Sequence, residues 1–203
     1  MTDYISVAQL RDYIGSDTSN FESVAQTACT VASRAVETMC DRVFTADTTA
    51  TARYFDPDSY YCVDVDDFHT TTGLIVATDT GADGTYATTW TINTDFIVLP
   101  INQRQGGIGG WPYTELRSLG TQSLVKPYPY VRPYVKVTAK WGWAAVPDQV
   151  EHATLVAAAR LFKMKDAADG FIGLDGWGPV RIRENPEVRA LLGPFMKHPV
   201  SVG

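Results

Sequence analysis

Residues 135–165 read VKVTAKWGWAAVPDQVEHATLVAAARLFKMK and contain, in order, the signals for a strand, a corner and a long helix. Every second residue from Val135 to Ala139 is apolar, which is the period of a half-buried strand. A Trp-Gly-Trp corner follows at 141–143, and Pro147 suits the first position of a helix. Acidic residues then precede basic ones, the order that the helix dipole favours. We therefore expect a strand over 131–140 and a helix over 147–165.

Three further helices are predicted from capping and periodicity. Ser6 and Gln9 form an S-x-x-Q capping box for a helix that ends at Gly15. A second box, at Ser19, starts a helix over 21–43 whose apolar positions recur at three- and four-residue steps and predict one alanine-rich face. Near the C-terminus, Asn185 caps a short helix that Gly193-Pro194 should stop. The two long helices are the natural packing partners.

The composition changes between residues 45 and 140, which are rich in Thr, Tyr, Val and Asp and have frequent turn residues. Strands are expected over 52–55, 60–65, 74–77, 87–92, 96–99 and 131–140. The stretch QRQGGIGGWP, residues 103–112, is too glycine-rich for anything but a loop. The predicted class is α+β: a small helical bundle from both chain ends, 1–44 and 141–203, with a β-rich insertion, 45–140, between helices two and three.

Charge and composition exclude several classes of protein. The 203 residues carry a net charge of −6, and no apolar run approaches bilayer-spanning length or the pattern of a signal peptide, so we expect no membrane partner. Residues 1–130 hold 7 basic and 16 acidic residues (net −9), and residues 131–203 hold 10 and 7 (net +3). This charge asymmetry is either accidental drift in surface composition or the sign of an acidic face that meets a basic face of another copy. Neither half has the basic stripe that grips nucleic acid.

Few residues of the sequence suggest a catalytic or metal-binding role. Asp64 and Asp66 would share one side of a strand and Asp67 and His69 the other, which favours a solvated strand face over a paired-carboxylate or metal site. The sequence from Asp79 resembles the start of a calcium-binding loop, but Trp90 occupies the position where such a loop needs a bidentate Glu, so no calcium site is predicted. Three cysteines, at 29, 40 and 62, have no metal-type spacing, and the first two should be buried free thiols. We expect no catalytic, cofactor-binding or metal-binding residues.

The 147–165 helix is apolar almost all round, which predicts burial on more than one side, either by its own chain or by a neighbouring subunit. The tryptophans fit core anchoring, and they also fit a subunit contact, where aromatic residues are enriched. Nine residues are candidates for a subunit or portal interface: Trp141, Trp143, Leu155, Phe162, Phe171, Ile172, Trp177, Val180 and Ile182.

The order of several motifs resembles the head-tail connector, or adaptor, proteins of long-tailed bacteriophages and related gene-transfer particles. These motifs are YISVAQLRDYIG, AVETMCDRVF, RYFD, VDDF, FIVLPIN, VKVTAKWGWAAVPDQVEHATLVAAARL and NPEVRALLGPF. Each motif alone is weak, and their order across most of the chain is the specific part. The β-rich insertion is longer than in the minimal members of the family, so the resemblance says least about residues 70–130.

The resemblance implies a structural virion protein without catalytic residues. Such proteins form a homo-oligomeric ring, typically of twelve copies, beneath the portal in the neck of the particle. The ring extends the channel through which DNA passes without specific binding, and it docks the next tail-proximal protein. Assembly would take place in the host cytoplasm.

Two other functions remain open. A β-rich binding module, for a carbohydrate or another virion protein, would use the helices as scaffold. A hydrolase would place its site at Asp64, Asp66 and His69.

Overall fold

The computed structural model describes residues 2–15, 21–120, 123–126, 132–163 and 185–197. The chain divides into two compact units. The helical unit comprises Met1–Phe44 and Val146–Gly203, and the β unit comprises Thr45–Ala145. Helices and an antiparallel sheet are both present, so the predicted α+β class is confirmed.

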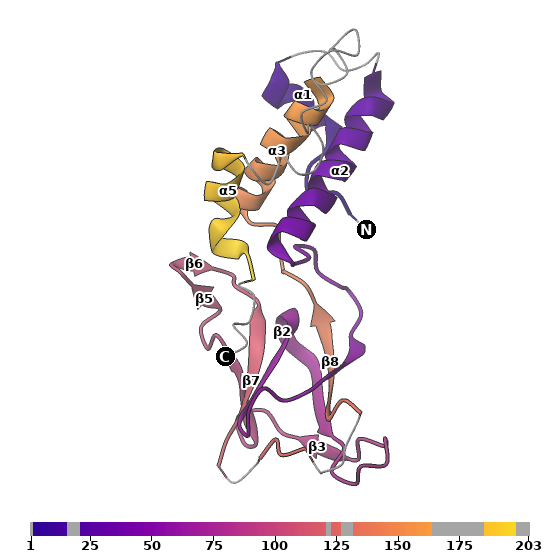
Figure 1. Cartoon of the computed structure of the whole chain (residues 1–203), viewed down its shortest axis with the longest axis vertical. Helices are drawn as coiled ribbons and strands as arrows, with labels where there is room; N and C mark the ends of the chain where they lie inside the picture. Colours follow the sequence, from indigo (N-terminus) through magenta and orange to yellow (C-terminus); the bar gives the residue numbers. More distant parts are fainter. Residues whose placement is uncertain (1, 16–20, 121–122, 127–131, 164–184, 198–203) are drawn as a thin grey trace. The chain divides into compact units, whose positions relative to one another are not determined.

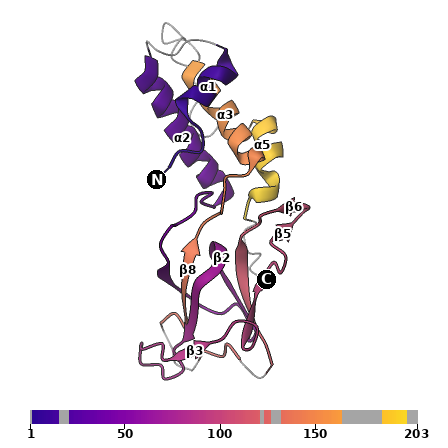
Figure 2. The same ribbon diagram turned by 180° about the vertical axis from the view of Figure 1, so that it is seen from behind.

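The helical unit is built around one central helix. Its described helices are α1 (Val7–Ile14), α2 (Glu22–Cys40), α3 (Asp148–Lys163) and α5 (Pro186–Leu192), and α5 continues into a 3-10 turn (Gly193–Phe195). Figures 1 and 2, seen from opposite sides, both show α3 between α2 and α5. Helices α2 and α5 therefore lie on different sides of α3, and they also contact each other: α2 ends at Cys40, whose main-chain oxygen accepts from the amide of Lys197 at 3.0 Å.

The ends of the helices follow the local sequence closely. Ser6 and Gln9 form the predicted capping box of α1, and Gly15 ends that helix with φ 64. Asn185 caps α5, since its side-chain oxygen accepts the amide hydrogen of Glu187 at 3.1 Å. Helix α5 ends at Leu192 with Gly193 as its C-cap, as predicted, and a short 3-10 turn follows as far as the buried Phe195. Ser19 lies outside the described residues.

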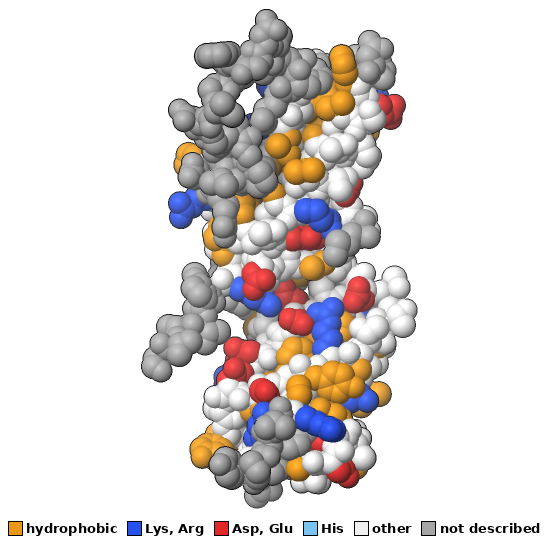
Figure 3. Space-filling view, turned by 45° about the vertical axis from the view of Figure 1, so that its right-hand side comes forward, with side chains coloured by type: hydrophobic (Ala, Val, Ile, Leu, Met, Phe, Trp, Pro, Cys, Tyr) orange, Lys and Arg blue, Asp and Glu red, His pale blue; other side chains and the backbone are white. Residues whose placement is uncertain are grey.

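Helix α2 has two adjacent apolar seams where the sequence predicted one face. The inner seam is Ala25, Cys29, Ala32, Val36 and Met39, all buried. The outer seam is Val24, Ala28, Val31, Ala35 and Thr38, in which Ala28 is buried, Ala35 is half-buried and the other three are exposed. Figure 3 shows hydrophobic side chains along the surface of the helical unit. The single predicted face merged residues of the two seams.

Helix α3 is covered by its own chain. Val150, Ala153, Val156, Ala157 and Ala159 are buried, and α1, α2 and α5 all pack against this helix. Of the two explanations for its apolar surface, packing within the chain accounts for it. The apolar character of α3 therefore carries no argument for neighbouring subunits.

The β unit contains one curved antiparallel sheet and a small hairpin. Its strands are β1 (Thr51–Phe55), β2 (Cys62–Thr78), β3 (Thr88–Trp90), β4 (Phe96–Leu99), β7 (Tyr113–Ser118) and β8 (Val135–Trp141). The order is β1-β8-β2-β7-β4, and β3 pairs with β2. The long central strand β2 joins the sheet together because β7, β8 and β3 all pair with it.

Three parts of the β unit differ from the prediction. The expected strands over 60–65 and 74–77 are one strand, β2, whose register shifts between Asp64 and Phe68 against β7 and twice between Phe68 and Ile75 against β8. Strand β7 was not predicted, because its sequence YTELRS has little apolar content. The glycine-rich stretch is not a plain loop: β5 (Arg104–Gln105) and β6 (Ile108–Gly109) pair across a two-residue Gly-Gly turn.

Candidate functional site

The Trp-Gly-Trp corner after β8 is fixed by hydrogen bonds to a neighbouring strand. Gly142 has φ 87, which a glycine adopts without steric cost. Its amide donates to the main-chain oxygen of Asp67 at 2.6 Å, and the indole Nε1 of Trp143 donates to the Asp67 carboxylate at 2.8 Å. The buried carboxylate of Asp67 is thereby hydrogen-bonded, as a buried polar group must be.

Both tryptophans of the corner are buried, and Trp141 belongs to the hydrophobic core of the β unit. Trp141 donates its indole N–H to the main-chain oxygen of Thr51 at 2.9 Å, and the Arg53 guanidinium lies 4.5 Å from the centre of its ring. The Trp143 ring meets Trp111 edge to face, with ring centres 4.9 Å apart. These contacts give both side chains a structural role inside their own unit.

Of the nine predicted interface residues, four lie within the described ranges, and three of those four are buried. Trp141 and Trp143 are each 1% exposed and Phe162 is 4% exposed, so they have little surface left for another chain. Leu155 is half-buried on α3. The remaining candidates, Phe171, Ile172, Trp177, Val180 and Ile182, lie outside the described residues.

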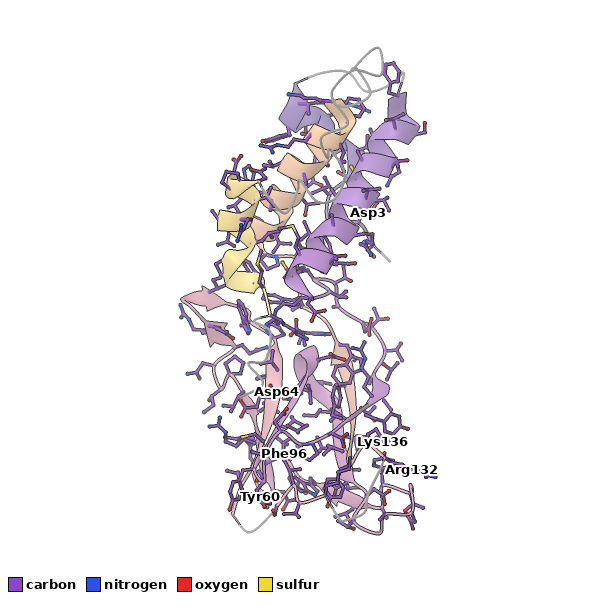
Figure 4. The ribbon with its side chains drawn as sticks, viewed as in Figure 1. Asp3, Tyr60, Asp64, Phe96, Arg132 and Lys136 are labelled. Carbon is purple, nitrogen blue, oxygen red and sulfur yellow. The ribbon has the colours of Figure 1, made fainter. Side chains whose placement is uncertain are left out.

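The acidic run on β2 does not converge on one centre. Asp64, labelled in Figure 4, is exposed, and its amide donates to the Asp58 carboxylate at 2.6 Å. Asp66 pairs with Arg53 at 2.7 Å, and Asp67 receives the Trp143 indole. His69 contributes its main-chain oxygen to Gln103 at 3.1 Å. Within the described ranges, no group of three or more His, Cys, Asp and Glu side chains could hold a metal ion.

The cysteines behave as structural thiols. Cys29 and Cys40 are buried and free, as predicted, and Cys62 is half-buried. Burial raises the pKa of the Cys29 thiol to about 11 and that of the Cys40 thiol to about 12. Both thiols are therefore protonated at neutral pH, which makes them poor nucleophiles.

Exposed apolar side chains form the most distinctive surfaces of the described residues. On α2 the outer seam exposes Val24 (38%) and Val31 (39%). On the β unit, the ring of the exposed Tyr54 lies 5.3 Å from that of Tyr86. The outer seam has a signal in the sequence, a 4-3-4-3 spacing beside an identical inner spacing, but periodicity alone did not separate the two.

Comparisons with known proteins reveal a likeness of fold. A chain of the solved structure described as "Neck of empty GTA particle computed with C6 symmetry" matches with a TM-score of 0.53 and 16% sequence identity. The match covers 98% of this chain and 93% of that chain. Its extent shows that both units belong to the shared fold. No protein-family model and no curated protein matches the sequence.

The described helices were also compared with the requirements for spanning a membrane. Of those in the described ranges, none combines the length and the apolar character that crossing a bilayer requires.

Proposed function

We propose that this chain is a structural protein of the neck of a phage-like particle, a head-to-tail adaptor. The observation that carries the proposal is the likeness of fold to a chain of a GTA particle neck over nearly the whole length of both chains. The order of connector-like motifs along the sequence supports the same function on separate grounds. The scattered partners of Asp64, Asp66 and His69 favour a structural role over a hydrolase.

In this proposal the chain forms a homo-oligomeric ring beneath the portal. Twelve copies, the number typical of the resembling family, are compatible with a neck that has six-fold symmetry. A ring repeats one heterologous contact until it closes, so two different faces of each subunit must meet. The ring extends the DNA channel and docks the next tail-proximal protein. The net charge of −6 suits a channel through which DNA slides without specific binding.

The proposed location is the virion neck, after assembly in the host cytoplasm. The test is to delete the gene and examine the particles by electron microscopy, with the plasmid-borne gene as the control. We expect full-sized heads without tails, and the chain should be found at the single portal vertex of complemented particles by immunogold labelling. Normal tailed particles without the gene would contradict the proposal.

The segment 166–184, which contains the remaining interface candidates, is proposed to reach a neighbour or the portal. Removing 166–203 is an unsuitable test, because that deletion also removes Val188, Leu192 and Phe195, which are fully buried in the helical unit. A Gly/Ser linker of equal length in place of 166–184 leaves α5 intact. We expect this variant to fold and fail to join heads, and normal joining would contradict the proposed role of the segment.

A β-rich binding module is the second candidate, favoured by the separate core of the β unit and its exposed Tyr54, Tyr60 and Tyr61. Expression of 45–145 alone, followed by glycan-array and virion-protein binding, tests it. If the isolated unit and the whole chain bind the same glycan or virion protein, the result would support a binding module.

A further inference from the structure

The outer face of the sheet at β8 carries two lysines in a chain whose net charge is −6. Lys136 and Lys140 stand on this face, because the residues that alternate with them, Val135, Val137 and Ala139, belong to the core. The two lysines are about 13 Å apart along the strand. Among the described residues, no acidic side chain forms an ion pair with either of them. Both ammonium groups are therefore available to an anionic partner.

Exposed apolar side chains lie beside these lysines. Tyr54 of the edge strand β1 is opposite Lys136 in the ladder, and Ile75 of β2 is opposite Thr138. Both Tyr54 and Ile75 are 52% exposed, and the centre of the Tyr86 ring lies 5.3 Å from that of Tyr54. Exposed apolar groups with a polar rim are typical of a surface that binds another protein. We call this surface, made of Tyr54, Ile75, Lys136 and Lys140, the basic patch.

The acidic residues near the basic patch are held by other groups. Asp79 is buried, and its carboxylate accepts two main-chain amides of its own turn at 3.2 and 2.6 Å. The Asp83 carboxylate accepts the amide and the hydroxyl of Thr85 at 2.9 and 2.7 Å. Figure 4 shows Arg132, a further cation, near Lys136. The basic patch therefore keeps its positive character.

An acidic patch with an exposed tyrosine lies elsewhere on the β unit. Asp58 and Asp64 are both exposed, and the amide of Asp64 donates to the Asp58 carboxylate at 2.6 Å. Tyr60, which is 65% exposed, completes this acidic patch. Asp64 is directly opposite Glu115 of β7, a pairing of like charges that destabilises a sheet. A cation from another molecule would reduce this repulsion, since the neighbouring Arg117 already pairs with Glu115 at 2.8 Å.

The two patches lie on different sides of the same unit. Figure 4 shows Asp64 and Tyr60 on one side of the β unit, and Lys136 and Arg132 on the other. Figure 3 brings the second side forward and shows basic side chains next to hydrophobic ones there. One copy of the chain therefore presents opposite charges in two directions, so neither patch can cover the other within one copy.

We propose that the basic patch of one copy receives the acidic patch of a second copy, and that this contact repeats around the ring. The inference rests on the proposed ring and adds the surfaces that close it. The ammonium groups of one patch meet the neighbouring carboxylates of the other, and the exposed tyrosines exclude water around them. Because two different faces meet, the contact is heterologous, as a closed ring of copies requires.

Nucleic acid is the other anion that a basic patch attracts. Lys136, Lys140 and Arg132 could make three phosphate contacts, fewer than the roughly 6–10 of a protein that grips DNA. DNA would also leave the acidic patch without a partner. A second copy of this chain uses both patches at once, and the charge complementarity therefore favours it.

Carbodiimide cross-linking tests the contact directly, because this reagent joins a carboxylate to a lysine amine that touches it. An equimolar mixture of isotope-labelled and unlabelled full-length chain separates links between copies from links within one copy. Mass spectrometry should find Lys136 or Lys140 joined to Asp58 or Asp64 in peptide pairs of mixed label. Lys163, exposed on α3, is the matched control amine and should give about tenfold fewer such links. Equal yields, or no link from the basic patch, would overturn the proposal.

Charge reversal with mixing tests the pairing of the two patches. Lys136→Glu with Lys140→Glu makes both patches acidic, and Asp58→Lys with Asp64→Lys makes both basic. Each reversed variant alone should self-associate about tenfold more weakly than the wild type in sedimentation velocity. An equimolar mixture of the two should recover wild-type association, because an all-acidic copy and an all-basic copy then alternate.

The control for net charge is Arg160→Glu with Lys163→Glu, at two exposed residues of α3, which should associate as the wild type does. Asp64→Lys alone is a milder variant that places a lysine opposite Glu115, and circular dichroism checks that it is folded. A monomeric wild type, wild-type association by a reversed variant, or a mixture no tighter than its parts overturns the contact. If reversing the lysines abolishes binding of a duplex DNA probe and leaves self-association unchanged, nucleic acid is the occupant and the proposal is wrong.

The neck function and this contact can fail separately. If the patches give no cross-link but the chain is found at the portal vertex, the neck function stands and the contact is wrong. If the mixture recovers association but gene deletion leaves tailed particles, the contact stands and the neck function is wrong.

Discussion

The two units of this chain fill their interiors in opposite ways. The β unit relies on a few large rings: Trp111, Trp141 and Trp143 are among its most deeply buried side chains. In the helical unit, the buried residues of the two long helices are mostly small, among them Ala25, Ala32 and Ala157. A core made of large rings held by hydrogen bonds tolerates the loss of one of these side chains poorly. A core made of small residues between closely packed helices tolerates replacement by a larger side chain poorly.

The largest effect is expected from deleting a ring in the β unit. Trp143→Ala removes the contact with Trp111 and leaves the Asp67 carboxylate without its indole donor. The loss should lower the free energy of unfolding by about 3–5 kcal/mol. Urea unfolding followed by circular dichroism measures it. Tyr60→Ala, at an aromatic residue that is 65% exposed, is the matched control and should change stability by less than about 0.5 kcal/mol. Equal losses would show that the buried ring supports the β unit no more than an exposed one does.

The helical unit was predicted well because its signals are local. The Ser6 capping box and the Asn185 cap each depend on residues within one turn, so sequence reasoning finds them without knowing the fold. The outer seam was missed because the inner and outer seams differ by one position on a single helix. Only the packing of α3 shows which of the two is covered.

The β unit was predicted less well because its sheet depends on distant pairing. Strand β7 has one strongly apolar residue, Leu116, and becomes a strand through its pairing with β2 and β4. Strand β2 continues through Gly73, which has φ 81, where the sequence suggested a break. Asp67 was considered as part of a metal or carboxylate site. Its role in holding Trp143 could not be predicted, since it joins residues 76 positions apart.

Removing the acceptor of the tryptophan corner should have a smaller effect than removing the ring. Asp67→Ala removes the acceptor of the Trp143 indole N–H and keeps the main-chain oxygen that accepts from Gly142, and we expect a loss of about 1–3 kcal/mol. The matched control is Asp66→Ala, one residue away, which breaks an ion pair with the exposed Arg53 and should cost at most about 1 kcal/mol. Thermal unfolding of both variants gives the comparison. A larger loss at Asp66 would show that the surface pair, not the buried carboxylate, holds the sheet.

The helical unit should respond to an added side chain. Ala32→Leu places three further carbon atoms in the inner seam, where Ala32 is fully buried, and should destabilise by about 1–3 kcal/mol. Ala35→Leu makes the same change in the outer seam, where the residue is half-buried, and should change the stability of a dilute subunit by less than about 0.5 kcal/mol. Chemical denaturation at low protein concentration separates the two. Equal losses would mean that α2 is covered on both seams within one chain.

The smallest effect is expected at the glycine-rich hairpin, which belongs to neither core. Gly107 has φ 85 and no neighbour within 4 Å of an added Cβ, so Gly107→Ala introduces backbone strain without a clash, roughly 1 kcal/mol. Gly109→Ala, two residues away in open space and outside the left-handed region, should be neutral. Because the strain is confined to the turn between Gln105 and Ile108, it should speed hydrogen exchange of these two amides and leave the core amides unchanged. Faster exchange throughout the sheet would show that the hairpin supports the β unit, and the division between rings and small residues would then describe only part of its stability.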